Sequence, residues 1–233
     1  GSAATWPTSQ HTDHITANLK RIAKTYHAEV RARFPQILRS NGGYALDRIC
    51  DAGDNINPID IICGSEGTLC VVVEAVLDLT PLPKHKALLL VHFDDLLDAL
   101  DATRHILEHR PAAVELLDAN VLEAAKKDPT VSGCLGFLDD RARAVLIVEL
   151  LGDRAEQILA SLSSLEAFLT ERRIGYAYRA MTNSAEQHDV WEMRKRGLGL
   201  LMSQPGDRQT CAFVEDTAVD PARLRDYIER FQG

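Results

Sequence analysis

The chain has 233 residues, an ordinary balance of apolar and charged side chains, and a formal net charge of −8 at pH 7. This length is sufficient for one large domain or two small ones, each with a buried core. The acidic balance argues against nucleic-acid binding, which needs clustered lysine and arginine. No apolar run approaches the roughly 20 residues that cross a bilayer, so we expect no membrane span.

The cysteines predict neither a disulfide framework nor a metal cluster. Their number is five, they are widely spaced, and no Cys-x-x-Cys pair occurs. Cys63 and Cys70 lie in apolar stretches, where cysteine commonly behaves as a small core residue. Residues 1–4 lack the basic and apolar pattern of a signal peptide. Together these features predict a cytoplasmic protein.

The first part of the chain predicts one long helix followed by turns. Apolar residues recur at helical spacing, so we expect a helix from Thr12 or Asp13, either of which can cap it, to Phe34, just before a proline. Residues 40–58 are rich in turn-forming types. Residues 59–63 are apolar and fit either a strand or the last turn of a helix.

A glycine-containing turn at residues 64–67 precedes a second apolar segment. Residues 69–79 are rich in valine and leucine, which predicts a buried strand. Residues 81–83 then place two prolines close together, which disfavours both a helix and a central strand. We therefore expect a boundary here, between a domain of residues 1–83 and a domain of residues 84–233.

Beyond the prolines, strands and helices alternate. We expect strands at 87–93, 113–117, 142–150, 175–181 and 211–219, and helices at 94–110, 120–127, 153–173, 185–202 and 220–231. Asp94 is the expected cap of the first of these helices. Periodicity leaves two architectures open: a parallel α/β sheet, or a ferredoxin-like α+β sheet that is antiparallel and carries helices on one face.

The turn before the valine-rich segment is the first candidate for binding chemistry. It consists of Gly64, Ser65, Glu66, Gly67, Thr68 and Leu69. Glycine lets a backbone approach a ligand and adopt positive φ, so such a turn can hold an anion such as a pyrophosphate. A plain glycine turn before a strand is the structural alternative. The segment is neither a Walker loop nor a Gly-x-Gly-x-x-Gly motif.

Residues 61–75, followed by residues 77–83, resemble the end of the flavin-binding domain in the FAD-linked oxidase family. That family includes D-lactate dehydrogenases, D-2-hydroxyglutarate dehydrogenases and the flavoprotein subunit of glycolate oxidase. Residues 43–47 resemble its Gly-Tyr-Asn/Asp-Leu segment, with Ala45 in place of the usual polar residue. The resemblance implies that the turn from Gly64 to Leu69, together with Tyr44, contacts FAD.

The resemblance continues in residues 113–118, 191–195 and 213–219, which look like parts of the family's substrate (cap) domain. It implies an α+β fold: a ferredoxin-like antiparallel sheet with helices, truncated at its end and preceded by the C-terminal part of a PCMH-type FAD-binding domain. Residues 195–201 and 205–208 are similar to large members that carry a fused iron–sulfur domain. An iron–sulfur cluster in a further C-terminal region is therefore implied.

Arg194 is the candidate for substrate binding. A guanidinium group binds a planar carboxylate through two parallel hydrogen bonds, which lysine cannot do. The matching arginine of the family holds the substrate carboxylate. On the residues alone, a solvated charge beside Lys195 and Arg196 is the alternative. Trp191, one helical turn earlier, is expected to belong to the core.

The remaining polar residues support no specific functional prediction. His105 and His109 are four residues apart on one helix, but no third ligand is evident, so we expect no metal site. Glu215 and Asp216 fit either a polar site at a strand end or a solvated strand end. The family's histidine motif, which supplies the base, is expected beyond Gly233, so the catalytic residues stay unknown.

The resemblance implies a flavin-dependent dehydrogenase that oxidises a small D-2-hydroxy acid, of the D-lactate, glycolate or 2-hydroxyglutarate type, by hydride transfer to FAD. Nothing before residue 40 resembles the family's glycine-rich phosphate-binding segment. We therefore expect this chain alone to be inactive and to bind FAD weakly or not at all. The alternatives are a non-catalytic ferredoxin-like ligand-binding domain and a PCMH-type flavoenzyme acting on a substrate without a carboxylate.

Overall fold

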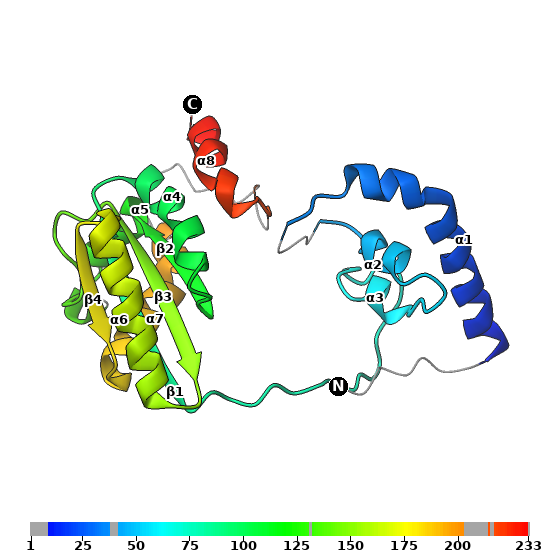
Figure 1. Ribbon diagram of the computed structural model, residues 1–233, viewed down its shortest axis with the longest axis horizontal. Helices are drawn as coiled ribbons and strands as arrows, with labels where there is room; N and C mark the ends of the chain where they lie inside the picture. Colours follow the sequence, from blue (N-terminus) through cyan, green and yellow to red (C-terminus); the bar gives the residue numbers. More distant parts are fainter. Residues whose placement is uncertain (1–8, 38–41, 131, 203–213, 215–216, 233) are drawn as a thin grey trace. The chain divides into compact units, whose positions relative to one another are not determined.

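The computed structural model describes residues 9–37, 42–130, 132–202, 214 and 217–232 (Figure 1). The chain divides into two units. The first comprises Gly1–Thr80 with Val214–Asp220, and the second comprises Pro81–Phe213 with Pro221–Gly233. Each unit has its own apolar core and is described by itself.

The first unit is helical. It consists of α1 (Gln10–Arg33), α2 (Leu46–Asp51) and α3 (Ile59–Ile62). Leu19, Ala23 and Val30 of α1 pack against Ile49 of α2 and Ile61 of α3. Residues 59–62 thus form a short helix that Cys63 ends in extended conformation, and α2 forms within a stretch where the sequence predicted only turns.

Helix α1 begins earlier than predicted because Ser9 caps it. The Ser9 hydroxyl accepts a hydrogen bond from the Thr12 N–H, and the Thr12 hydroxyl accepts one from the Ser9 N–H. This reciprocal arrangement is a capping box, in which Thr12 is the third helical residue and not the cap. The end of the helix agrees with the prediction, since Phe34 follows Arg33 in extended conformation.

The predicted buried strand at residues 69–79 is wrong for this structure. Residues 70–83 form no strand, and Val71, Val73 and Val76 are 86%, 93% and 94% exposed. A strand needs a neighbour that bonds its backbone and covers its side chains. No strand of the described residues pairs with this segment. Cys63 and Cys70 are exposed as well, contrary to the expectation that they belong to the core.

The second unit is built on a sheet. Within the described residues it has four strands in the order β2-β3-β1-β4, and every neighbouring pair is antiparallel. The strands are β1 (His85–Phe93), β2 (Ala113–Asp118), β3 (Ala144–Gly152) and β4 (Ala177–Met181). The ferredoxin-like prediction is therefore confirmed and the parallel alternative is wrong. Strands alternate with helices in the sequence although the sheet is antiparallel, because the two strands joined by a helix do not lie side by side. β3 lies between β1 and β2, and β1 lies between β3 and β4.

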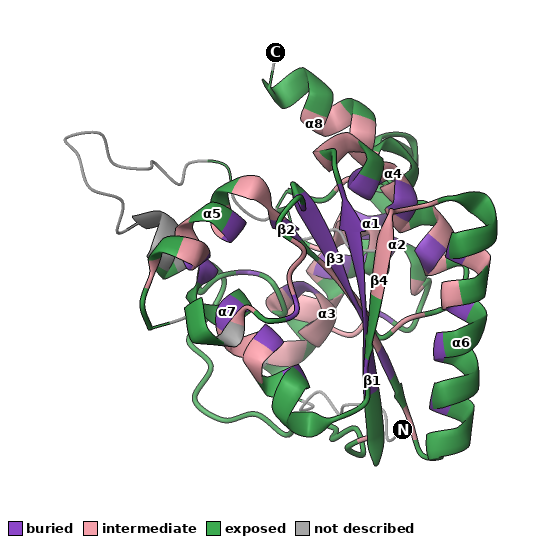
Figure 2. Ribbon diagram, turned by 90° about the vertical axis from the view of Figure 1, so that its left-hand side faces the viewer, coloured by how far each residue is buried: buried purple, intermediate pink, exposed green. Residues whose placement is uncertain are grey.

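Helices cover both faces of this sheet, whereas one covered face was expected. Leu89 and Val91 of β1 pack on the side of α4 (Leu96–Leu107) and α6 (Ala155–Arg172). Leu88 and Leu90 pack on the side of α5 (Ala119–Lys127) and α7 (Ser184–Met202). Figure 2 shows the buried strands in purple between these helices. The continuous apolar sequence of β1 is explained by this burial on two sides.

The predicted helices of this unit are confirmed with small shifts at their ends. Asp95, and not Asp94, caps α4, because its carboxylate accepts hydrogen bonds from the N–H groups of Leu97 and Asp98. The last predicted helix is a short 3₁₀ turn (Pro221–Arg223) followed by α8 (Leu224–Gln232). Most of the strand expected at 211–219 lies outside the described residues, and residues 217–219 are not in a strand.

We expect Gly175→Ala to lower the free energy of unfolding of the second unit by about 3 kcal/mol. Gly175 has φ +78°, and a Cβ there would lie 2.6 Å from Val91 Cγ1 and 3.2 Å from the His92 carbonyl oxygen. Urea unfolding followed by circular dichroism measures the change. Gly199→Ala is the control: no atom lies within 4 Å of an added Cβ in that helix, so we expect a gain of about 1 kcal/mol. Equal effects at the two positions would contradict the proposed clash.

Candidate functional site

The turn at residues 64–69 follows α3 and has a defined conformation. Gly64, Glu66 and Gly67 have φ values of +85°, +51° and +75°. The Ser65 N–H donates to the Ile62 carbonyl at 3.0 Å, and the Thr68 N–H donates to the Ser65 carbonyl at 2.9 Å. These two N–H groups are therefore used inside the turn and are not available to a phosphate. Ser65 is 5% exposed, so its side chain is a buried part of the turn.

Tyr44 and Thr68, which are 24 residues apart, lie together at this turn. Their hydroxyl oxygens are 2.9 Å apart. The Thr68 hydroxyl donates its own proton to the Ser65 carbonyl at 2.6 Å, so Tyr44 is the donor in the contact between the two hydroxyls. The structure thus brings together two of the residues for which the family resemblance implied contact with FAD. That contact itself stays a prediction.

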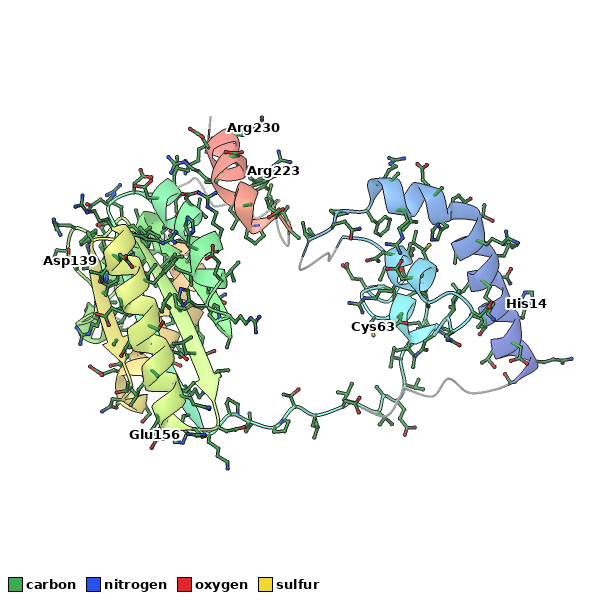
Figure 3. The ribbon with its side chains drawn as sticks, in the orientation of Figure 1. His14, Cys63, Asp139, Glu156, Arg223 and Arg230 are labelled. Atoms are coloured by element: carbon green, nitrogen blue, oxygen red, sulfur yellow. The ribbon has the colours of Figure 1, made fainter. Side chains whose placement is uncertain are left out.

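The backbone of the turn is open at its two glycines. A Cβ added at Gly64 or Gly67 would meet no atom within 4 Å, so space is open over both glycines. Glu66, Thr68 and Leu69 are exposed beside them. Open glycine backbone next to an anchored tyrosine fits the close approach of a flavin. Cys63, labelled in Figure 3, immediately precedes this surface.

Arg194 lies on α7 in the second unit. Its Nε donates to Glu115 Oε2 of β2 at 2.9 Å, and the two side chains are 48% and 34% exposed. Lys195 pairs with Glu192 on the same helix, and Arg196 reaches the Thr130 hydroxyl. Arg196 also lies 4.0 Å from Glu192, so it shares that carboxylate with Lys195, whereas Arg194 has a different partner. Arg194 is the one bonded to the sheet, and its role toward a substrate stays a prediction.

Other charged groups lie on the same side of the sheet as Glu115. Burial raises the pKa of Glu149 on β3, the Lys86 charge lowers it, and the charge of Glu115 raises it further. Trp191, one turn before Arg194, is half-buried and packs against the core formed with α5 and α7, as predicted. The core thus fixes the helix from which Arg194 extends.

His105 lies on α4, whereas His109 follows the end of that helix, contrary to the expectation that both lie on one helix. His105 Nδ1 lies 3.6 Å from Glu108 Oε1, whereas the His109 ring packs edge-on against Phe168 with 4.6 Å between centroids. Within the described residues, no group of three or more His, Cys, Asp or Glu side chains could hold a metal ion. Glu215 and Asp216 lie outside the described residues.

A polar cluster at one end of the sheet was missed by the sequence analysis. His92 of β1 is 2% exposed, and its Nδ1 lies 3.3 Å from the Ala177 carbonyl, so Nδ1 carries the proton. Burial lowers the pKa of His92, and the hydrogen bond to Ala177 opposes that effect. The Tyr176 hydroxyl donates to Asp139, labelled in Figure 3, at 3.1 Å, and the Arg141 guanidinium lies over the Tyr176 ring. The signal available in the sequence was a histidine within the otherwise apolar strand predicted at residues 87–93.

Burial and the neighbouring Asp139 raise the pKa of Tyr176 to about 12. Because this pKa exceeds the ordinary value of 10.0, the neutral phenol stabilises the folded state. That stabilisation is present below pH 10 and is lost as the pH rises through about 12. We expect Asp139→Asn to shift the titration to lower pH, because the carboxylate charge and its hydrogen bond both favour the neutral phenol. Ultraviolet absorbance titration, with Tyr176→Phe identifying the signal, measures the shift. An unchanged titration curve would show that Asp139 does not act on Tyr176.

Comparison with known proteins identifies the class. Residues 82–233 match the C-terminal domain of the FAD-linked oxidases, and the chain belongs to that family. It is similar to D-2-hydroxyglutarate dehydrogenase of Pseudomonas putida, with 32% identity over 222 residues that cover 92% of this chain and 22% of that protein. The enzyme of the same name from Escherichia coli is 33% identical over 212 residues, covering 86% and 21%.

A more distant relative is the mitochondrial D-lactate dehydrogenase (cytochrome) of Kluyveromyces lactis, 26% identical over 185 residues that cover 78% of this chain and 31% of that protein. The chain therefore spans about a fifth of the length of the bacterial relatives and less than a third of the yeast one. In the part of the chain that the structure describes, no helix is long and apolar enough to cross a membrane.

Proposed function

We propose that this chain is part of an FAD-dependent dehydrogenase that oxidises a D-2-hydroxy acid to the 2-oxo acid. The observation that carries the proposal is that the chain combines a flavin-type turn anchored by Tyr44 with an arginine held by the sheet of a cap-type domain. The relatives named as dehydrogenases of D-2-hydroxyglutarate and D-lactate support it.

In this proposal one unit binds the cofactor and the other binds the substrate. Residues 1–83 are the C-terminal portion of the flavin-binding domain, and residues 84–233 are the substrate cap domain. When bound, the flavin supplies the redox chemistry by accepting a hydride. The residues of this chain contribute binding and orientation: the turn at 64–69 offers open backbone to the cofactor, and Arg194 offers hydrogen-bond donors to a carboxylate.

The comparisons favour one substrate class over the other. The D-2-hydroxyglutarate dehydrogenases are 29–33% identical to this chain, and the D-lactate dehydrogenases are 24–26% identical. We therefore favour a hydroxy acid with a second carboxylate. The resemblance of residues 195–201 and 205–208 to large family members supports an iron–sulfur cluster elsewhere in the enzyme. The cytoplasmic location stays a prediction.

We expect Arg194→Ala in the full-length enzyme to raise the KM for the D-2-hydroxy acid about 10- to 100-fold. Loss of a charge-assisted hydrogen bond costs about 1.5–3 kcal/mol, and 1.4 kcal/mol corresponds to a factor of ten. Steady-state kinetics measures the change. Arg194→Lys should recover only part of the loss, since lysine keeps the charge without the planar fork. Arg196→Ala, two residues away and bonded to Thr130, is the matched control. An unchanged KM for Arg194→Ala would show that Arg194 does not bind the substrate.

We expect Gly67→Ala in the full-length enzyme to weaken FAD binding at least tenfold, because the added methyl group enters the open space over the turn and strains a backbone at φ +75°. Reconstitution of the apoenzyme, followed by flavin fluorescence, measures the Kd. Gly53→Ala is the matched control in the same unit: it has φ +57° and equally open surroundings, but lies outside the turn. Equal weakening by both substitutions would mean that backbone strain, and not the lost approach to the turn, is responsible.

A further inference from the structure

Glu115 is a charged residue on a face of the sheet that is mostly apolar. Side chains alternate between the faces along a strand, so Glu115 shares its face with Leu117, which belongs to the core formed with α5 and α7. Its register partner on β3 is Ile147, which is fully buried on that same face. A carboxylate at such a position needs a partner. Arg194 is that partner, across 79 residues of sequence.

The geometry of the contact leaves the arginine with unused binding capacity. Glu115 Oε2 accepts from Nε, which is one corner of the guanidinium plane. Arginine has five N–H donors, and the two terminal nitrogens present a second pair of parallel N–H bonds along another edge of the plane. That edge can bind a carboxylate through two hydrogen bonds while Nε stays with Glu115. Because Arg194 is 48% exposed, a ligand can reach the guanidinium group.

Both ends of the pair are held by rigid elements. Glu115 lies within β2, which is paired with β3 along its length. Arg194 directly follows Met193, and both Met193 and Val190 of α7 are completely buried. A long arginine side chain loses rotamer freedom when it binds a ligand, and that loss weakens binding. A carboxylate fixed in the sheet removes much of this freedom before the ligand arrives.

We propose that Glu115 is a positioning residue: it holds the Nε of Arg194 so that the two terminal nitrogens are presented to the substrate carboxylate. The proposal rests on the proposed function of Arg194. A plain structural ion pair between α7 and the sheet is the competing explanation. It predicts an effect on stability, whereas positioning predicts an effect on substrate binding that depends on Arg194.

The test compares Glu115→Ala, Glu115→Gln and Glu115→Asp in the full-length enzyme, alone and combined with Arg194→Ala. We expect Glu115→Ala to raise the KM for the hydroxy acid roughly tenfold while kcat changes less, and Glu115→Gln, which keeps an acceptor oxygen, to have a smaller effect. In the Arg194→Ala background, Glu115→Ala should change KM no further, because the group that it positions is gone.

The matched control is Glu186→Ala. Glu186, near the start of α7, pairs with Arg179 of β4 at 3.3 Å, so this substitution also breaks an ion pair between α7 and the sheet. We expect it to leave KM unchanged. Thermal unfolding of each variant separates stability from binding, and Glu115→Gln serves where Glu115→Ala does not fold, since its amide keeps the size and an acceptor oxygen.

The outcomes separate this proposal from the function on which it rests. If Arg194→Ala raises KM and none of the Glu115 substitutions does, the positioning role is overturned and the substrate role of Arg194 stands. If Glu115→Ala lowers KM, Glu115 competes with the substrate, which also overturns the proposal. If Glu115→Ala raises KM equally with and without Arg194, its effect does not pass through the arginine. If Arg194→Ala itself changes nothing, the proposed function fails.

Discussion

The burial of β1 on both faces is the constraint on which the second unit depends. Residues Ala87 to Val91 are completely buried, with helices packed on either side. A strand in this position cannot carry uncompensated polar side chains. The charged and polar side chains described above therefore lie on the outer strands β2 and β4, on the helix surfaces and toward the ends of strands. Glu115 lies on β2, Arg194 lies on the surface of α7, and the cluster around Tyr176 lies at the ends of strands.

Much of this unit could be predicted from the sequence because its periodicity is strong. In α6, Ile158, Leu162, Leu165 and Leu169 repeat on one face, and all four are buried. What periodicity could not decide was the direction of neighbouring strands. A strand–helix–strand unit has the same pattern whether its two strands lie side by side or leave room for a third between them. The resemblance to a known family, and not the pattern, favoured the antiparallel arrangement.

The candidate site was predictable only in part, for a related reason. Arg194 and the glycine turn were found because each lies in a short motif. Glu115 was part of a matched segment, but no local signal shows that it meets a side chain 79 residues away. The family resemblance predicted that Tyr44 and the turn contact the same cofactor, whereas only the structure shows the hydrogen bond between Tyr44 and Thr68. Contacts between distant residues depend on strand register and on helix packing, and a local sequence pattern predicts neither.

The prediction for residues 69–79 failed because composition reports which side chains are apolar and does not report what covers them. Here those valines and leucines are in water. An extended, unpaired and valine-rich segment is a template for pairing with another chain. In a preparation of this chain by itself, such a segment favours self-association as the concentration rises. The property that predicted a strand thus leaves the isolated chain with an exposed apolar segment that belongs to neither folded core.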